Sequence, residues 1–378
     1  MGPATSEAPT AGKKPRLLVI SNMWPSDSNP VFGVFVKRNV RALRDAGAHV
    51  TVVSNSDPRT GGRAAARKYA SLMLRAWIAA RRGRFDAVVG HYLYPTAAIA
   101  RMAADRARVP LVLVTHGTDV RSVMREDRFG RAGRAALSSA DLVVTVSGAL
   151  ERVVREELEL PAAVPTAVIN MGIDDELFAP DAHAREKLHI EPGARVVLFA
   201  GNLVLTKGVD VLAEAFFALL DSGRADRLVL VGDGPLAKDV LARVAENAVS
   251  FEHADPTDRV MLTGRLHQRD LARWMAAADV FVLPSRAEGL GLVLLEAMAC
   301  GTPCVGSDVG GIPEVLATPS CGALAPAEDP AALADAIAEV LATGKDSYEA
   351  ACRAQAACHS ANRKAEEMLA AIERVARA

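Results

Sequence analysis

Two glutamates with seven residues between them, Glu288 and Glu296, are the residues of this chain best suited to binding a ligand. Gly289 and Gly291 permit close backbone approach, and the apolar residues after them predict a helix over 292–300. The unpaired N–H groups at a helix start attract an anion. We therefore expect a diphosphate here, with Glu288 accepting hydrogen bonds from glycosyl hydroxyls and Glu296 accepting them from a ribose.

The two glutamates belong to a longer pattern, which matters because solvated glutamates flanking a helix are the alternative. From Glu288 to Glu314 the chain reads E-G-x-G-L-x-x-L-E-A-M-A-C-G-T-P-C-V-G-S-D-V-G-G-I-P-E. This resembles the donor-binding signature of retaining, GT-B-fold glycosyltransferases of family four. The resemblance implies transfer of a hexosyl or N-acetylhexosaminyl unit from a nucleoside diphosphate sugar, with UDP expected. The backbone of the turn would then contact the donor through Gly289, Leu290, Gly291 and Leu292.

A phosphate-binding candidate follows the apolar run 195–200. Lys207 places one cation where backbone amides can also meet a phosphate, with a solvated loop lysine as the alternative. Members of the family commonly carry arginine where this chain has Asn202. Either Lys207 acts alone, then, or Arg265 or Arg286 supplies a second charge. The predicted donor-binding residues of this region are Gly201, Asn202, Lys207, Gly208, Arg265 and Leu266.

In the first half of the chain, the segment T-H-G-T-D (115–119) directly follows an apolar run and resembles the family's histidine-glycine loop. The resemblance implies that His116 donates a hydrogen bond to the transferred sugar or to a phosphate oxygen. His116, Lys207 and Glu288 are therefore the expected catalytic residues. Asp119 would hold acceptor hydroxyls or the loop itself. Further acceptor-side candidates are Gly33, His91 and Tyr94, with aromatic packing as the alternative for the last two.

The elements that must position these residues are short apolar strands alternating with helical stretches. Strands are expected over 16–21, 50–54, 87–90, 111–115, 142–146, 195–200, 227–232, 260–264, 280–283 and 304–306. Continuous apolar strands separated by helices predict parallel sheets covered on both faces. We expect an α/β protein in which two Rossmann-like, doubly wound domains face an interdomain cleft, the arrangement that the resemblance implies as the GT-B class.

Four divisions of the chain are expected, and the resemblance implies the roles given to the two domains. These divisions are a flexible tail (1–15), an N-terminal acceptor-side domain (16–182), a C-terminal nucleotide-sugar-binding domain (183–350) and a C-terminal helix (351–378). The resemblance implies that this last helix crosses back to the N-terminal domain. It also implies that N-M-G-I-D (170–174) is an interdomain turn.

Charge divides between the two halves of the 378 residues, although the formal net charge is only −1. Up to residue 180 there are 25 basic and 17 acidic residues, against 19 and 28 in the remainder. Several of the basic residues fall within 63–84 around an apolar stripe. This segment is either a solvated helix packed on the sheet or a helix that touches anionic lipid. Nucleic acid is not an expected partner, because aromatics are scarce and no known nucleic-acid module is present.

The location expected from the sequence is the cytoplasm, with the inner membrane face as a peripheral site. No run approaches 18 apolar residues and the start of the chain has no long apolar stretch. The five cysteines are odd in number and contain no C-x-x-C pair, so they are expected to be reduced thiols.

The expected chemistry needs no cofactor and no metal, because the chain contains no Asp-x-Asp motif. The resemblance implies same-face displacement, in which the departing phosphate oxygen takes the proton of the acceptor hydroxyl. Two other classes compete with this hypothesis. A Rossmann-type oxidoreductase would need a G-x-G-x-x-G turn, which the chain lacks. A non-catalytic sugar-nucleotide-binding scaffold would not need His116, Lys207, Glu288 and Glu296 together.

Overall fold

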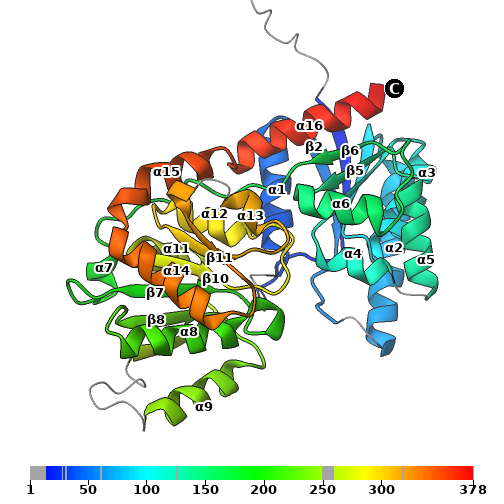
Figure 1. Cartoon of the computed structure of the whole chain (residues 1–378). Coiled ribbons are helices and arrows are strands. Elements are labelled where there is room, and N and C mark those ends of the chain that lie inside the picture. The colour runs from blue at the N-terminus through cyan, green and yellow to red at the C-terminus, as the bar shows by residue number, and fades with distance from the viewer. Residues whose placement is uncertain are drawn as a thin grey trace, which may run out of the picture.

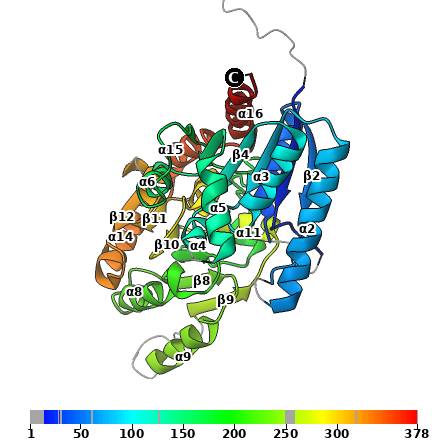
Figure 2. The ribbon, with the colours of Figure 1, turned by 90° about the vertical axis from the view of Figure 1, so that its right-hand side faces the viewer.

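The computed structural model describes residues 14–27, 29, 32–59, 62–124, 127–248, 259–316 and 319–377. Within these ranges the chain forms two parallel six-stranded sheets, each covered by helices (Figure 1). The predicted α/β class with two Rossmann-like sheets is confirmed. Figure 2, turned by 90°, views the first sheet with its covering helices in front.

The N-terminal sheet has the strand order β2-β1-β3-β4-β5-β6, with every neighbouring pair parallel. β3, β4 and β5 are buried at every position, as apolar runs covered on both faces require. The strands are β1 (Arg16–Ser21), β2 (His49–Ser54), β3 (Ala87–His91), β4 (Leu111–Thr115), β5 (Leu142–Thr145) and β6 (Thr166–Val168). The helices are α1 (Val34–Asp45), α2 (Gly62–Arg82), α3 (Thr96–Ala107), α4 (Thr118–Val123), α5 (Arg128–Ser138) and α6 (Gly148–Glu156).

The second sheet has the order β12-β11-β10-β7-β8-β9 and is also parallel. Its strands are β7 (Val196–Ala200), β8 (Arg227–Val231), β9 (Val260–Gly264), β10 (Val280–Leu283), β11 (Cys304–Ser307) and β12 (Gly322–Ala325). The α-helices are α7 (Ala184–Lys187), α8 (Val209–Asp221), α9 (Ala237–Ala248), α11 (Gln268–Ala277), α12 (Leu292–Ala299), α13 (Ile312–Val315) and α14 (Pro330–Thr343). Two 3-10 turns, η1 (Leu205–Lys207) and η2 (Pro319–Cys321), lie between them.

The end of the chain returns to the first domain. α15 (Asp346–Ala357) packs on α12, and α16 (Ala361–Arg377) packs on α1 at the top of Figure 1. Where the sequence suggested a single helical segment, the structure has two helices separated at 358–360. The break is tertiary in origin, since Ile173 N–H donates to the His359 carbonyl and Ala361 N–H donates to the Ile173 carbonyl, at 2.9 and 2.8 Å.

Two strands were not expected from the sequence. β6 has three residues, none of them fully buried, and β12 has one large residue, Leu324, among a glycine and two alanines. Both are edge strands, which need less apolar character than central ones. The predicted tail (1–15) lies outside the described residues apart from 14 and 15.

Candidate active site

The turn between β10 and α12 has the geometry that its glycines predict. Gly291 has a φ of 89° and forms the N-cap of α12, a conformation that glycine adopts without strain. Gly289 lies against the first domain, since a Cβ there would approach the His116 carbonyl oxygen at 2.5 Å. Leu290 is buried beneath the turn and Leu292 opens the helix. The backbone of 289–292 therefore forms a tight turn that leads into the start of α12.

Lys207 and Glu288, which lie on separate loops, form an ion pair between Nζ and Oε2. Their meeting depends on Gly208, whose φ is 65° and whose Cβ, if present, would lie 1.9 Å from the Pro284 carbonyl oxygen. Only glycine permits this approach of η1 to the end of β10. The Ser285 hydroxyl also donates to Glu288 Oε2, at 3.4 Å. The predicted phosphate clamp and the predicted sugar-binding carboxylate are thus one paired unit.

Arg286 and Arg265, the two candidates for a second phosphate-binding cation, differ in how far their guanidinium groups are already paired. Arg286 is engaged with Asp210 through both terminal nitrogens, at 2.8 and 2.9 Å, and with Glu328 at 2.8 Å. The hydrogen bonds to Asp210 raise the pKa of this guanidinium. Arg265, in contrast, is about half exposed and lies 3.9 Å from Asp233. Arg265 is therefore the better placed of the two to meet an anion.

The loops after β7, β8 and β9 adjoin one another at the carboxyl ends of these strands. Gly232 N–H donates to the Gly264 carbonyl at 2.9 Å, and a Cβ on Gly232 would lie 1.8 Å from the Gly201 carbonyl oxygen. Asn202 is exposed at this end of the sheet and makes no side-chain hydrogen bond within the described residues. Leu266 packs partly buried against the core.

Glu296 meets a residue that the sequence did not indicate. Nη1 of Arg38, on α1 of the first domain, donates to Glu296 Oε1 at 2.9 Å. The side chains are only 8% and 13% exposed, respectively. Burial raises the pKa of Glu296, and Arg38 opposes that shift. The only sequence signal for Arg38 was an arginine among the apolar positions of an amphipathic helix.

His116 lies within a cluster of rings. Its Nε2 is 3.2 Å from Nδ1 of His91, and the rings of Phe35 and Tyr92 lie 5.0 and 4.6 Å from its own. Burial lowers the pKa of both histidines, to about 4 for His91. Both imidazoles are therefore neutral near pH 7, and one of them donates to the other.

The remaining acceptor-side candidates have structural contacts. Asp119 accepts from the backbone N–H groups of Leu93, His116 and Gly117 at 3.0, 2.9 and 2.8 Å, so it holds the histidine loop. The Tyr94 hydroxyl donates to Asp127 at 2.9 Å. Gly33 has a φ of 73° and touches the Met23 backbone, where a Cβ would collide at 2.6 Å.

The histidine loop (115–119) and the turn at 289–292, called the donor turn from here on, are in direct contact across the two domains. A Cβ on Gly117 would lie 3.1 Å from the Gly289 Cα. Nearby, Glu314 accepts from the N–H groups of Gly148 and Ala149 at 2.9 and 2.6 Å and so caps α6 from the other domain. The structure thus brings the backbone of His116 and Gly117 against Gly289, next to the Lys207–Glu288 pair, while the His116 ring packs within the ring cluster.

Comparison with known proteins identifies the family of this chain. The profile described as Glycosyltransferase Family 4 matches residues 33–177, and the one described as Glycosyl transferases group 1 matches residues 194–343. D-inositol 3-phosphate glycosyltransferase of Jonesia denitrificans is 33% identical over 328 residues, covering 80% of this chain and 74% of that protein. N-acetyl-alpha-D-glucosaminyl L-malate synthase of Bacillus anthracis is 31% identical over 265 residues, with coverages of 69% and 67%.

Among solved structures, HepE of Anabaena in complex with UDP superimposes with a TM-score of 0.73 at 19% identity, covering 95% of this chain and all of that one. The chain belongs to the family 4, group 1 glycosyltransferases and has their GT-B fold. It is a glycosyltransferase, so the oxidoreductase alternative is wrong. Over the described residues, none of the helices combines the length and apolar character that a membrane span requires.

Proposed function

We propose that this chain is a retaining, metal-independent glycosyltransferase that moves a hexosyl or N-acetylhexosaminyl unit from a UDP-sugar to a hydroxyl. The observation that carries the proposal is the Lys207–Glu288 pair at the entrance of α12, against which the histidine loop packs. A diphosphate at this entrance meets an ammonium group and the first-turn N–H groups of a helix. UDP is the proposed nucleotide because the solved HepE complex, similar in fold, contains it.

The proposed roles follow from position. Lys207 neutralises the leaving diphosphate, with Arg265 as the second cation, and Glu288 accepts hydrogen bonds from hydroxyls of the transferred sugar. Glu296 accepts them from the ribose. His116 belongs to the opposite domain, and its loop, which touches Gly289, would close the sugar site.

The proposed reaction needs no protein nucleophile. The bond between the sugar and the diphosphate oxygen breaks, and a bond to the acceptor oxygen forms on the same face of the ring. The leaving oxygen takes the acceptor's proton. Charge neutralisation by Lys207 instead of a metal is supported by the sequence, which lacks Asp-x-Asp.

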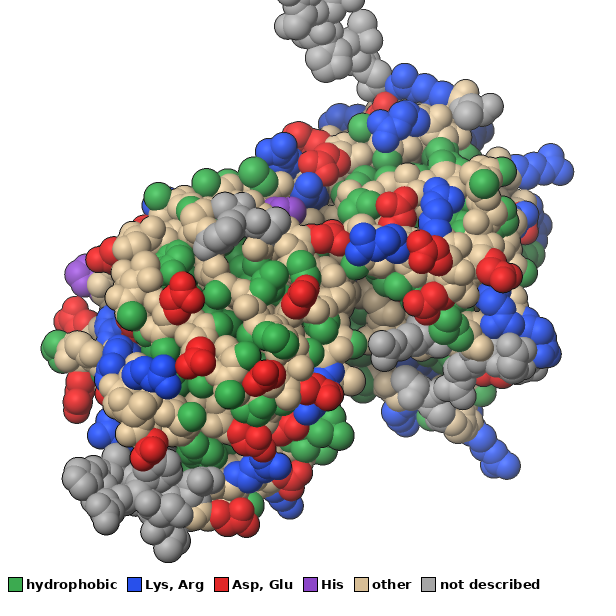
Figure 3. Space-filling model, in the orientation of Figure 1, with side chains coloured by type: hydrophobic (Ala, Val, Ile, Leu, Met, Phe, Trp, Pro, Cys, Tyr) green, Lys and Arg blue, Asp and Glu red, His purple; other side chains and the backbone are tan. Residues whose placement is uncertain are grey.

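The proposed acceptor is a hydroxyl of a cell-surface polysaccharide or glycolipid intermediate, or of a secondary metabolite. A lipid-linked acceptor is favoured by α2, which exposes Arg63, Arg67, Met73 and Leu74 together. Lys and Arg side chains also project from the N-terminal domain in Figure 3. Lys68 is not part of this surface, since its ammonium is buried against the Asp57 and Arg59 carbonyls. We therefore propose a cytoplasmic enzyme whose α2 touches the anionic inner membrane face.

The test is release of UDP from a panel of UDP-sugars, followed by mutation. Glu288→Gln and Lys207→Ala should each lower kcat by about 100-fold or more, because each removes a group that stabilises developing charge or orients the sugar. Lys187→Ala is the matched control, since it breaks a lysine–aspartate pair elsewhere on the same domain. Normal turnover by both site variants would contradict the assignment. Tight UDP-sugar binding without turnover on any acceptor would favour the scaffold alternative.

A further inference from the structure

Arg38 and Glu296 are 258 positions apart and belong to different domains, yet they form the buried ion pair described above. The guanidinium also lies over the ring of Phe178, 5.7 Å from its centroid. A guanidinium held over a ring and paired with a carboxylate has less freedom to turn than a solvated one. The contact with Phe178 therefore restricts the directions in which Arg38 presents its donors to Glu296.

The pair leaves polar groups unused. Among the described residues, Arg38 is the only side chain that donates to the Glu296 carboxylate, and it does so through Oε1. Oε2 therefore retains its capacity to accept hydrogen bonds. Nη2 of Arg38 is buried without a hydrogen-bond partner. An unpaired buried donor is costly, so its presence next to a carboxylate marks a place where a polar ligand group is expected.

We propose that Arg38 is a positioning residue for donor recognition, holding Glu296 so that Oε2 accepts a hydrogen bond from a ribose hydroxyl. This inference rests on the proposed function, in which Glu296 binds the ribose. Because α1 and α12 belong to different domains, Glu296 is held in this way only while the two domains lie together. The ribose is thus read by a carboxylate that the opposite domain orients.

The charges around Glu296 agree with this role. Burial favours the protonated acid, and Asp174 on the interdomain segment adds to that effect. Arg38 opposes both and so favours the ionised carboxylate, the form whose two oxygens only accept hydrogen bonds. Without Arg38, donor binding through Glu296 would weaken at a higher pH than in the wild-type protein.

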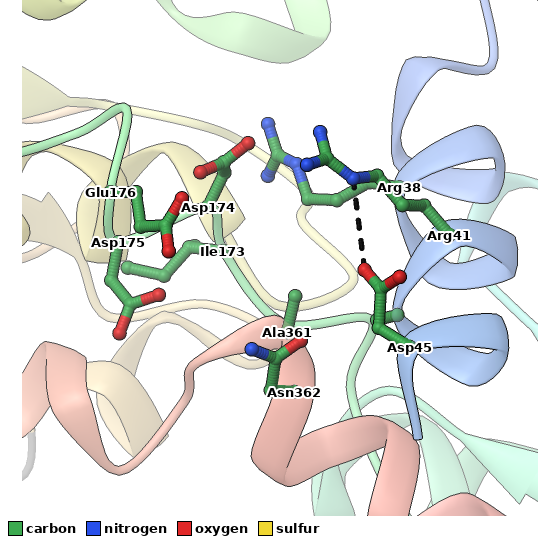
Figure 4. Close-up of a pocket in the computed structure, with 10 residues that line it drawn as sticks. Arg38, Arg41, Asp45, Ile173, Asp174, Asp175, Glu176, Ala361 and Asn362 are labelled. Atoms are coloured by element: carbon green, nitrogen blue, oxygen red, sulfur yellow. Dashed lines mark ion pairs between the residues drawn. The ribbon is translucent and has the colours of Figure 1, made fainter. Parts of the chain in front are cut away.

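The same region supplies a matched control. Figure 4 shows Arg38 and Arg41 on the same helix, lining a pocket with Asp45, Asp174 and Asn362. Arg41 pairs with Asp45 at 3.7 Å, both side chains being exposed, and it makes no ion pair with Glu296 within the described residues. Arg41→Gln therefore removes an arginine from α1 without changing the partner of Glu296.

The experiment measures dissociation constants of UDP, 2′-deoxy-UDP and 3′-deoxy-UDP by calorimetry on the full chain. The wild-type protein should prefer UDP over at least one deoxy analogue by about 10- to 100-fold, the range for a hydrogen bond to a charged group. Glu296→Gln and Arg38→Gln should each reduce that preference to about 3-fold or less, and the double variant should reduce it no further. Arg41→Gln should keep the full preference. Arg38→Lys keeps the positive charge but not the planar guanidinium, and it should retain an intermediate preference for UDP.

Each other outcome overturns the inference. If Arg38→Gln binds all three nucleotides more weakly by one common factor, Arg38 has only a structural role. If it binds UDP more tightly than the wild-type protein, Arg38 blocks the site. If the wild-type protein does not bind UDP, or Glu296→Gln leaves the preference unchanged, the proposed function of Glu296 fails and the inference fails with it. Should Arg38→Gln not fold, Arg38→Lys and the double variant, which leaves no unpaired charge, give the same decision.

Discussion

The hydroxyl of Ser147 donates a 2.6 Å hydrogen bond to the carbonyl oxygen of Gly289. The same oxygen of Ser147 accepts from the Leu150 N–H at 3.1 Å and caps α6. One side chain of the N-terminal domain therefore caps its own helix and holds the donor turn of the other domain. Ser147 was not among the residues that the sequence indicated.

Replacing Ser147 by alanine should lower both stability and activity. Loss of the N-cap costs about 1 kcal/mol. Loss of the bond to Gly289 should lower kcat/KM for the donor by about 10-fold, the equivalent of one hydrogen bond. Thermal unfolding and steady-state kinetics measure the two effects separately.

Asp329→Ala is the control for that variant. Asp329 caps α14 by accepting from the Ala332 N–H at 2.9 Å, and within the described residues its side chain makes no hydrogen bond to the first domain. Asp329→Ala should lower the free energy of unfolding by a similar amount and leave kcat/KM near the wild-type value. Equal losses of kcat/KM in both variants would show that Ser147 acts through stability alone.

Gly208→Ala should disrupt the Lys207–Glu288 pair. A Cβ at this position would lie 1.9 Å from the Pro284 carbonyl oxygen, so η1 must move away from the end of β10. We expect a loss of at least about 10-fold in kcat/KM, because catalytic groups displaced by about 1 Å lose much of their effect.

The matched control for this glycine is Gly223→Ala. Gly223 has a φ of 63°, close to the 65° of Gly208, but nothing lies within 4 Å of the position that a Cβ would occupy there. Both alanines pay the left-handed backbone cost of about 1 kcal/mol, and only Gly208→Ala should also lose activity. Normal turnover in Gly208→Ala would contradict the role given to this approach.

Stability should fall in mild acid because of the buried histidines. His91 is fully buried and burial lowers its pKa to about 4, with His116 lowered in the same direction and Asp119 and Tyr92 beside them. A histidine with a lowered pKa binds fewer protons when folded. Its contribution to stability is therefore complete above about pH 6.5 and is lost as the pH falls toward 4.

His91→Gln tests this effect, since glutamine can hydrogen-bond to His116 but does not titrate. Between pH 6.5 and 5, one such histidine accounts for about 2 kcal/mol of lost unfolding free energy. Denaturant unfolding at both pH values should show a smaller loss in the variant than in the wild-type protein. Equal losses would show that His91 is not responsible.

The sheets and the donor turn could be predicted because their signals are local. β10 is a short apolar run ended by Pro284, and Gly289 and Gly291 predict the turn after it. The Lys207–Glu288 contact was half predicted: both residues were chosen for a ligand, and their pairing with each other was not. That pairing depends on the approach of Gly208 to Pro284, which spacing along the chain does not encode.

Arg38 and Ser147 could not be found from the sequence for a different reason. Each acts on the other domain, so its role depends on how the two sheets face each other. α1 carries Arg38, Arg41 and Arg44, and no pattern in the helix says which of them meets Glu296. Asp119 was assigned two possible roles, and its three backbone hydrogen bonds show that it holds the loop.

The tie between the interdomain segment and the end of α15 has a mechanical consequence. The chain passes between the domains at Ile173 and again at His359, and the two passages are bonded to each other at one place. Gly172 packs there so closely that a Cβ would lie 2.5 Å from the Ala361 Cα. The two interdomain passages of the chain are therefore joined at a single point, which can serve as a hinge between the domains. Rotation about this point is the relative motion of the two domains that leaves both hydrogen bonds intact.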